Sequence, residues 1–207
     1  MTNVIGDIAG QYDALMALLK KMPDDQVVSV GDLIDRGTKS KEVVEWFMRH
    51  GKAVLGNHEH LMLDHYRDTW YYGQRGMWHY NGGSKTEESF GGPVPENVLA
   101  WVETLPLYLE LEGCLISHAF VNADLGLARA CELGSSIIDA ENSIIWDRHY
   151  PRRMPEYKTQ IAGHNGWMGL KYFSDDQGDF AICIDDSPKK KLTGIHLPSM
   201  VVYQQDF

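Results

Sequence analysis

Short apolar runs alternate with stretches of helical spacing over the first third of the chain. The short runs predict three strands, at residues 4–5, 27–30 and 53–55. Stretches with apolar residues three or four positions apart predict three helices, at residues 11–22, 40–50 and 58–66. This alternation is typical of βαβ units, so we expect the three strands to form a parallel sheet.

The second part of the chain is richer in short apolar runs. Residues 107–111 and 114–117 flank a Glu-Gly pair and predict a β-hairpin. Further strands are predicted at residues 160–162, 180–184, 192–197 and 200–204. These runs favour mainly antiparallel pairing. Residues 69–92, rich in Gly, Trp and Tyr, predict a cap or loop, and residues 95–104 predict a short helix.

No internal repeat or low-complexity linker divides the chain, so we expect residues 1–207 to form one α/β domain. The two halves together suggest two sheets packed face to face with helices outside. The composition, 43% hydrophobic and 23% charged, is that of a soluble globular protein. No apolar run approaches the roughly 18 residues that span a bilayer, and no secretory signal pattern opens the chain.

The net charge and the cysteines indicate which partners and which cellular compartment to expect. A net charge of -10 makes the chain a poor general binder of nucleic acid. The three cysteines, Cys114, Cys131 and Cys183, are widely spaced and form no CxxC pair. They are interpreted as buried or unreactive thiols of a reducing compartment, not as metal ligands. We therefore expect a cytoplasmic protein with no membrane partner.

Three glycine-led motifs follow the first three predicted strands: GDIAG at residues 6–10, GDLIDRG at 31–37 and GNHE at 56–59. Glycine allows a sharp turn at each strand end, which can present Asp7, Asp32 and Asn57 to one cleft. His118 and His164 also follow apolar runs and would add imidazole nitrogens. Such oxygen and nitrogen donors favour Mn, Fe or Zn, and a pair of these ions suits the hydrolysis of phosphate esters.

These motifs resemble the GDxHG, GDxxDRG and GNHE patterns of the calcineurin-like metallophosphoesterases, in particular the phosphoprotein-phosphatase branch. Later segments fit its small bacterial and phage members: NGG at 81–83, ISHA at 116–119, IWDR at 145–148 and AGH at 162–164. The resemblance runs from Val4 to Asp185 in the family's order. It implies a four-layer sandwich of two mixed β-sheets flanked by helices. It also implies two divalent metal ions, Mn first, with Fe, Zn or Ni as alternatives.

The resemblance also implies a role for each motif residue. Asp7, Asp32 and a histidine at position 9 would hold the first metal, and Asp32, Asn57, His118 and His164 the second. A hydroxide shared by the two metals would attack phosphorus directly. His58 would act as the general acid, with its ring fixed by Asp35. Three side chains would contact the substrate phosphate: Arg36, Asn57 and Arg148.

Ala9 departs from the pattern, because the family has a histidine there and alanine offers no donor atom. The implied first metal site is short of one ligand, so we expect impaired activity. Two explanations stay open, natural divergence and a recent or engineered substitution. The otherwise complete motifs favour the second.

Three functions are compatible with these residues. The main hypothesis is a protein phosphatase acting on phosphorylated Ser or Thr, with Tyr as an extension. The alternative is a dinucleoside polyphosphate hydrolase or nucleotide phosphodiesterase, for which an aromatic group could stack on a base or serve only as hydrophobic cover. That group comprises Trp70, Tyr71, Tyr72, Trp78 and Tyr80. A third hypothesis is an inactive phosphate-binding regulatory module. The expected partner is accordingly a phosphorylated protein, nucleotide or other small molecule.

Overall fold

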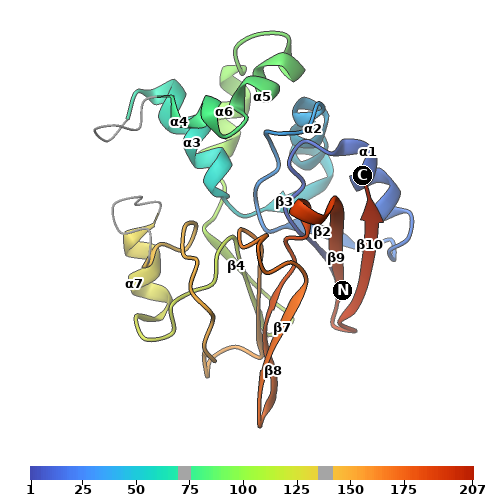
Figure 1. Cartoon of the computed structure of the whole chain (residues 1–207), viewed down its shortest axis with the longest axis vertical. Coiled ribbons are helices and arrows are strands. Elements are labelled where there is room, and N and C mark those ends of the chain that lie inside the picture. The colour runs from blue at the N-terminus through green and yellow to red at the C-terminus, as the bar shows by residue number, and fades with distance from the viewer. Residues whose placement is uncertain (70–75, 135–141) are drawn as a thin grey trace.

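The computed structural model describes residues 1–69, 76–134 and 142–207. Its strands form two five-stranded sheets, in the orders β10-β9-β1-β2-β3 and β4-β5-β6-β8-β7 (Figure 1). The first sheet contains β1 (Thr2–Ile5), β2 (Gln26–Ser29), β3 (Gly51–Ala53), β9 (Lys191–Leu197) and β10 (Val201–Asp206). The second contains β4 (Tyr108–Leu111), β5 (Cys114–Ser117), β6 (Thr159–Ala162), β7 (Lys171–Asp175) and β8 (Gly178–Cys183). This α/β fold of two mixed sheets confirms the expected fold class.

The first sheet confirms the βαβαβ order predicted from the first third of the chain. Strands β1, β2 and β3 are parallel, and the crossovers are α1 (Tyr12–Leu19) and α2 (Ser40–His50). Near the C-terminus, β9 pairs antiparallel with the free edge of β1, and β10 pairs antiparallel with β9. The sheet is mixed because β9 runs antiparallel to both of its neighbours, β1 and β10.

The second sheet corrects the prediction of mainly antiparallel pairing. Strands β5, β6 and β8 are parallel to one another, and only the edge strands β4 and β7 pair antiparallel. The segment between β5 and β6 is long enough for a crossover and includes α7 (Gly126–Leu133), which the sequence pattern did not predict. As a consequence, β5, β6 and β8 all end at the same edge of the sheet.

Helices also occupy most of the described part of the region predicted as a cap or loop. They are α4 (Met77–Tyr80) and α5 (Gly83–Phe90). On either side, α3 (Asn57–Arg67) and α6 (Glu96–Val102) confirm the helices predicted at residues 58–66 and 95–104, and a 3-10 turn, η2 (Ser187–Lys189), precedes β9. Figure 1 shows α3 to α6 together at one end of the molecule, above the strand ends. In the described ranges, no helix combines the length and apolarity needed to cross a membrane.

The two sheets pack against each other through an aliphatic layer. Val4, Val28 and Ile195 of the first sheet meet Ile116 and Ile161 of the second, and all are buried. Strand alternation sends the neighbouring Ile5 to the opposite face, where α1 and α2 cover it. Burying each such side chain contributes about 1.5–3 kcal/mol, so this layer holds the two sheets in fixed register. Cys114 and Cys183 are buried, as predicted.

Candidate active site

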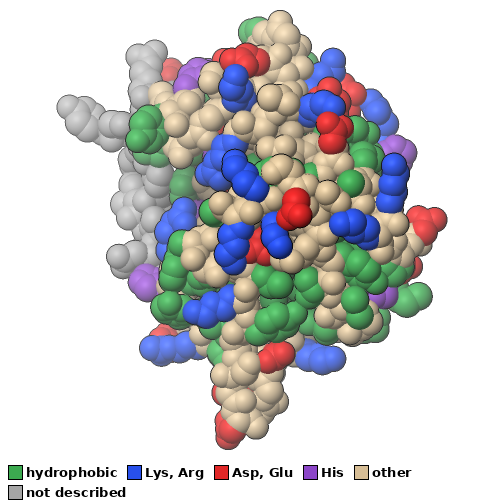
Figure 2. All heavy atoms as spheres, turned by 45° about the vertical axis from the view of Figure 1, so that its right-hand side comes forward, with side chains coloured by type: hydrophobic (Ala, Val, Ile, Leu, Met, Phe, Trp, Pro, Cys, Tyr) green, Lys and Arg blue, Asp and Glu red, His purple; other side chains and the backbone are tan. Residues whose placement is uncertain are grey.

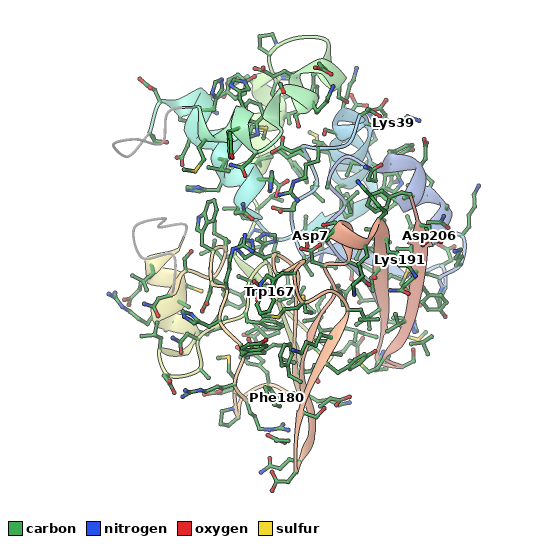
Figure 3. All side chains as sticks on the ribbon, viewed as in Figure 1. Asp7, Lys39, Trp167, Phe180, Lys191 and Asp206 are labelled. Carbon is green, nitrogen blue, oxygen red and sulfur yellow. The ribbon has the colours of Figure 1, made fainter. Side chains whose placement is uncertain are left out.

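The predicted metal ligands all lie at the carboxyl ends of parallel strands. Asp7 follows β1, Asp32 follows β2, Asn57 begins α3 after β3, and His118 and His164 follow β5 and β6. Each of the five is at most 6% exposed. Figure 3 places Asp7 near the middle of the molecule, below the helices and above the strands of the second sheet. The structure therefore brings these side chains together in one buried cluster.

Each of the two histidines has one ring nitrogen on a backbone carbonyl and the other directed into this cluster, so the neutral tautomer that donates to the carbonyl presents a lone pair to the cluster. The Nδ1–H of His118 donates to the Val30 carbonyl at 2.7 Å, which leaves Nε2 as an acceptor facing Asn57 Oδ1 at 2.9 Å. The Nε2–H of His164 donates to the Trp146 carbonyl at 3.2 Å, and its Nδ1 faces the same Asn57 Oδ1 at 2.9 Å. Burial lowers the pKa of both histidines, which favours their neutral form.

Lone pairs converging without a proton between them repel, and a cation removes that repulsion. Imidazoles that donate their other N–H to a carbonyl are typical of metal ligands. Asp32 Oδ1 completes the group at 3.3 Å from His118 Nε2. The donor set of two imidazoles, an amide oxygen and a carboxylate therefore fits a divalent transition metal.

A second group of donors adjoins the first through Asp32. Donor atoms of Asp7, Asp32 and His118 all lie within 4.8 Å of one another. Burial and the nearby carboxylates of Asp185 and Asp32 raise the pKa of Asp7 well above its usual range. Burial opposes the ionisation of Asp32, but His118 and His58 together lower the pKa of Asp32 to about 2. Asp32 belongs to both groups, which is the position that a bridging carboxylate requires.

Asp185 is a site residue that the sequence reasoning missed. It is 4% exposed, lies just beyond β8 and interacts with the Asp7 carboxylate. Its Oδ1 accepts hydrogen bonds from the backbone N–H and hydroxyl of Ser187, at 3.0 and 2.6 Å. The available signal was a carboxylate directly after the strand predicted at residues 180–184, without the leading glycine that identified Asp7.

The loops that carry the site hold several side chains in an unusual backbone conformation. Ala9, Asp32, Asp35, Arg36 and His164 have φ between +48° and +71°, the left-handed region that L-residues rarely adopt. Such strain persists only where the surroundings impose it, and it clusters at functional sites.

Glu59, the last residue of GNHE, connects two of these loops. Its carboxylate accepts backbone N–H groups of Asp32 at 2.9 Å, Leu33 at 2.8 Å and Gly56 at 3.1 Å. It is completely buried, and burial together with the charge of Asp32 raises the pKa of Glu59 to about 7. The sequence analysis gave Glu59 no role, although its contacts place Asp32 relative to Asn57.

Replacing Glu59 by Gln is expected to destabilise the protein by about 2 kcal/mol at pH 8 in EDTA. A carboxamide has one oxygen for three N–H donors, so at least one buried donor loses its partner. Urea denaturation measures the free energy of unfolding. Glu132→Gln is the matched control, because the Glu132 side chain is 65% exposed. A value for Glu59→Gln within about 0.5 kcal/mol of the wild type would contradict the bracing role.

His58 lies between a carboxylate and a guanidinium. Its Nδ1–H donates to Asp35 Oδ2 at 2.6 Å, and Arg36 Nη2 donates to its Nε2 at 2.8 Å. Burial lowers the pKa of His58, but Asp32 and Asp35 outweigh burial and raise that pKa above its usual value. The predicted contact between His58 and Asp35 is present.

Two further side chains that the sequence reasoning missed hold Asp35. Trp78 Nε1–H donates to both carboxylate oxygens of Asp35 at 3.1 Å, and the Thr86 hydroxyl donates to Oδ1 at 2.6 Å. Trp78 is fully buried, so it serves as packing and cannot stack on a substrate base. Tyr80 is 92% exposed, whereas Trp70, Tyr71 and Tyr72 lie outside the described residues.

The two predicted phosphate-binding arginines contact this cluster from the outside. Arg36 reaches His58, and Arg148 Nη1–H donates to the His164 carbonyl at 3.2 Å. Both residues are exposed, so their guanidinium groups are accessible to a substrate phosphate. In Figure 2, Lys and Arg side chains are spread among acidic ones over the visible face.

Comparisons with known proteins agree with this geometry. A symmetrical bis(5'-nucleosyl)-tetraphosphatase from Vibrio campbellii is 31% identical over 155 residues, which cover 70% of this chain and 54% of that protein. The counterpart from Vibrio parahaemolyticus is 34% identical over 140 residues, which cover 63% of this chain and 49% of that protein. The chain thus spans about half the length of these curated relatives.

Solved structures share the fold at lower sequence identity. One provisionally named a diadenosine tetraphosphatase has a TM-score of 0.72 at 20% identity, covering 99% of this chain and 92% of that one. A cold-active protein-tyrosine phosphatase from a psychrophilic Shewanella has a TM-score of 0.63 at 20% identity, covering 95% and 75%. The family model for calcineurin-like phosphoesterases matches residues 2–185. The chain belongs to the calcineurin-like phosphoesterases.

Proposed function

We propose that this chain hydrolyses phosphate esters with two bound divalent metal ions, Mn²⁺ first and Fe, Zn or Ni as alternatives. The observation that carries the proposal is the convergence of unprotonated donors from Asp32, Asn57, His118 and His164. Asp7 and Asp32 would hold one ion, and those four residues the other. When bound, such ions lower the pKa of water and neutralise charge on the phosphate.

The residues around the cluster would supply the remaining chemistry. Arg36 and Arg148 would bind non-bridging phosphate oxygens, with the Asn57 amide as a further contact. In the structure, Arg36 Nη2 donates to His58 Nε2, the nitrogen that must carry the proton if His58 is to act as the general acid. An arriving phosphate would draw the Arg36 guanidinium to itself. Nε2 could then take up a proton that Asp35 and Asp32 stabilise and deliver it to the leaving oxygen.

Dinucleoside polyphosphates are the substrate class that we place first. The curated relatives at 31–34% identity are named bis(5'-nucleosyl)-tetraphosphatases. A surface pocket of about 530 Å³ also adjoins the Arg148 loop, lined by His149, Tyr150 and Arg152 among others. It is large enough to hold part of a nucleoside beyond the phosphate.

Phosphoproteins, the main expectation from sequence, become the second candidate. The segment behind that expectation, residues 81–83, lies directly against the backbone of Arg36: a Cβ on Gly82 would be 2.9 Å from the Arg36 backbone nitrogen. This segment therefore shapes the approach to a predicted phosphate ligand. Cytoplasmic location and the one-domain organisation stay predictions.

A substrate panel separates these functions. Purified protein with saturating Mn²⁺ would be given diadenosine tetraphosphate, phosphoserine, phosphothreonine and phosphotyrosine peptides, and a cyclic nucleotide. Turnover should be fastest on diadenosine tetraphosphate. A higher kcat/KM on phosphopeptides would favour the second candidate. Absence of turnover on every substrate, by this chain and by Ala9→His, would favour an inactive phosphate-binding module.

Ala9→His is expected to raise turnover at least about tenfold, equivalent to ~1.4 kcal/mol of transition-state stabilisation. The reason is that the first metal would gain an imidazole ligand. The backbone at Ala9 already has φ +48°, a conformation in which histidine is several-fold enriched among non-glycine residues. Steady-state rates at saturating Mn²⁺ test it, with Ala128→His on the exposed face of α7 as control.

The presence of Asp185 is the main reason why Ala9→His could raise turnover by less than tenfold. Its carboxylate beside Asp7 would supply an oxygen to the first metal in place of the missing histidine. Asp185→Asn should then lower the Mn²⁺ content of the present chain more than that of Ala9→His. If Ala9→His is no faster on any phosphoester, and Asp185→Asn leaves the metal content unchanged, the assignment of the first metal is wrong.

A further inference from the structure

A second cluster of metal-binding side chains lies away from the active site, between three helices. Donor atoms of His65 on α3, His79 on α4 and Glu87 on α5 all lie within 4.8 Å of one another. His79 Nε2 and Glu87 Oε2 are 3.0 Å apart, and the His65 and His79 rings meet edge to face with centroids 4.5 Å apart. Figure 1 shows these three helices side by side at one end of the molecule.

The Glu87 carboxylate is oriented by a hydrogen bond to the oxygen that does not face His79. Glu87 Oε1 accepts the Tyr66 hydroxyl proton at 2.9 Å, and the Tyr66 oxygen in turn accepts the Val94 N–H at 2.9 Å. This support leaves Oε2 directed at His79. Metal-binding carboxylates are commonly oriented by such outer hydrogen bonds.

The chemistry of the donors selects the ion. Two imidazoles and one carboxylate form a set that zinc uses with one further ligand, whereas Mg²⁺ and Ca²⁺ prefer oxygen alone. Ligands about 2.0–2.2 Å from a tetrahedral zinc ion lie roughly 3.4 Å apart. The 3.0 Å between His79 Nε2 and Glu87 Oε2 is close to that value, and the donor atoms of all three residues lie within 4.8 Å of one another.

We propose that His65, His79 and Glu87 bind one zinc-class divalent transition-metal ion that ties α3, α4 and α5 together behind the active site. Each of two ligands is adjacent in sequence to a residue that holds Asp35: His79 follows Trp78, and Glu87 follows Thr86. The ion would therefore keep these two supports of Asp35 in place. The site is separate from the proposed catalytic metals, and its existence does not depend on the proposed function.

Metal counting tests the proposal directly. Metal-free protein is dialysed against buffered Zn²⁺, and bound zinc is measured by mass spectrometry. His79→Gln and Glu87→Gln are each expected to bind one equivalent less than the wild type. His50→Gln, which removes an exposed histidine at the end of α2, is the matched control and should bind as much as the wild type. Circular dichroism verifies the folding of each variant, and His65→Gln replaces any variant that fails.

Anomalous diffraction at the zinc edge locates the ion without relying on variants. Crystals of the zinc-loaded wild type should show a peak within bonding distance of the ring nitrogens of His65 and His79. Equal zinc content in wild type, His79→Gln and Glu87→Gln would overturn the proposal and leave His79 and Glu87 as a simple ion pair. A peak at the active site without one at this cluster would overturn it as well. Neither readout requires turnover, so an inactive protein would not affect the test.

Discussion

Asp32→Asn is expected to lower phosphoester hydrolysis at least about a thousandfold, equivalent to ~4 kcal/mol. Asp32 is the carboxylate shared by both donor groups, through Asp7 on one side and His118 on the other. An amide of the same shape has no charge and only one oxygen, so it cannot serve two cations. Both metal content and rate should fall, because the two proposed ions depend on this bridge.

The measurement combines rates on nitrophenyl phosphate at saturating Mn²⁺ with metal analysis of the same samples. Asp13→Asn is the matched control, because it makes the same chemical change at a side chain that is 78% exposed. The variant should stay folded, since Asn retains the shape and can still accept the His58 backbone N–H, which is 3.1 Å from Asp32 Oδ1. A rate within tenfold of wild type would rule out Asp32 as a bridging ligand.

His58→Asn is expected to slow hydrolysis of alkyl phosphates by roughly a hundredfold or more, and of nitrophenyl phosphate by less than about tenfold. A general acid matters when the leaving oxygen needs a proton, and a nitrophenolate does not. The contact between His58 Nδ1 and Asp35 Oδ2 at 2.6 Å would hold the ring so that Nε2 faces the substrate.

Asp35→Asn extends the same experiment. Asp35 acts through His58, so Asp35→Asn should show the same dependence on the leaving group, with a smaller decrease in rate than His58→Asn. Because Trp78 and Thr86 donate hydrogen bonds to Asp35, this substitution also weakens structural contacts. Circular dichroism of each variant separates a loss of folding from a loss of catalysis. Equal losses on both substrates for His58→Asn would indicate a structural or metal-binding role instead of proton donation.

Local patterns were sufficient for much of the fold and for most of the proposed ligands. The strands and helices of the first third follow from hydrophobic periodicity, which depends only on neighbours in sequence. Glycine-led turns after predicted strands pointed to Asp7, Asp32 and Asn57 for a related reason. In a parallel sheet, strand ends meet at one edge, so the position along the chain already indicates the position in space.

Other features depend on contacts between distant segments. A short apolar run does not indicate the direction of its partner, so the parallel order of β5, β6 and β8 was not predicted. Helices α4 and α5 have weak periodicity of their own and are stabilised by burying Trp78 and Thr86 against Asp35.

The sequence by itself therefore determined the family, the order of the first elements and the side chains proposed for the metals, because these depend on local pattern and on residue type. Only the tertiary structure decided which residues support them. Glu59 braces a loop 26–27 positions away, and Asp185 meets Asp7 from the far end of the chain. His65, His79 and Glu87 come together only because three helices pack side by side. Such meetings depend on chain geometry, and no periodicity in the sequence encodes them.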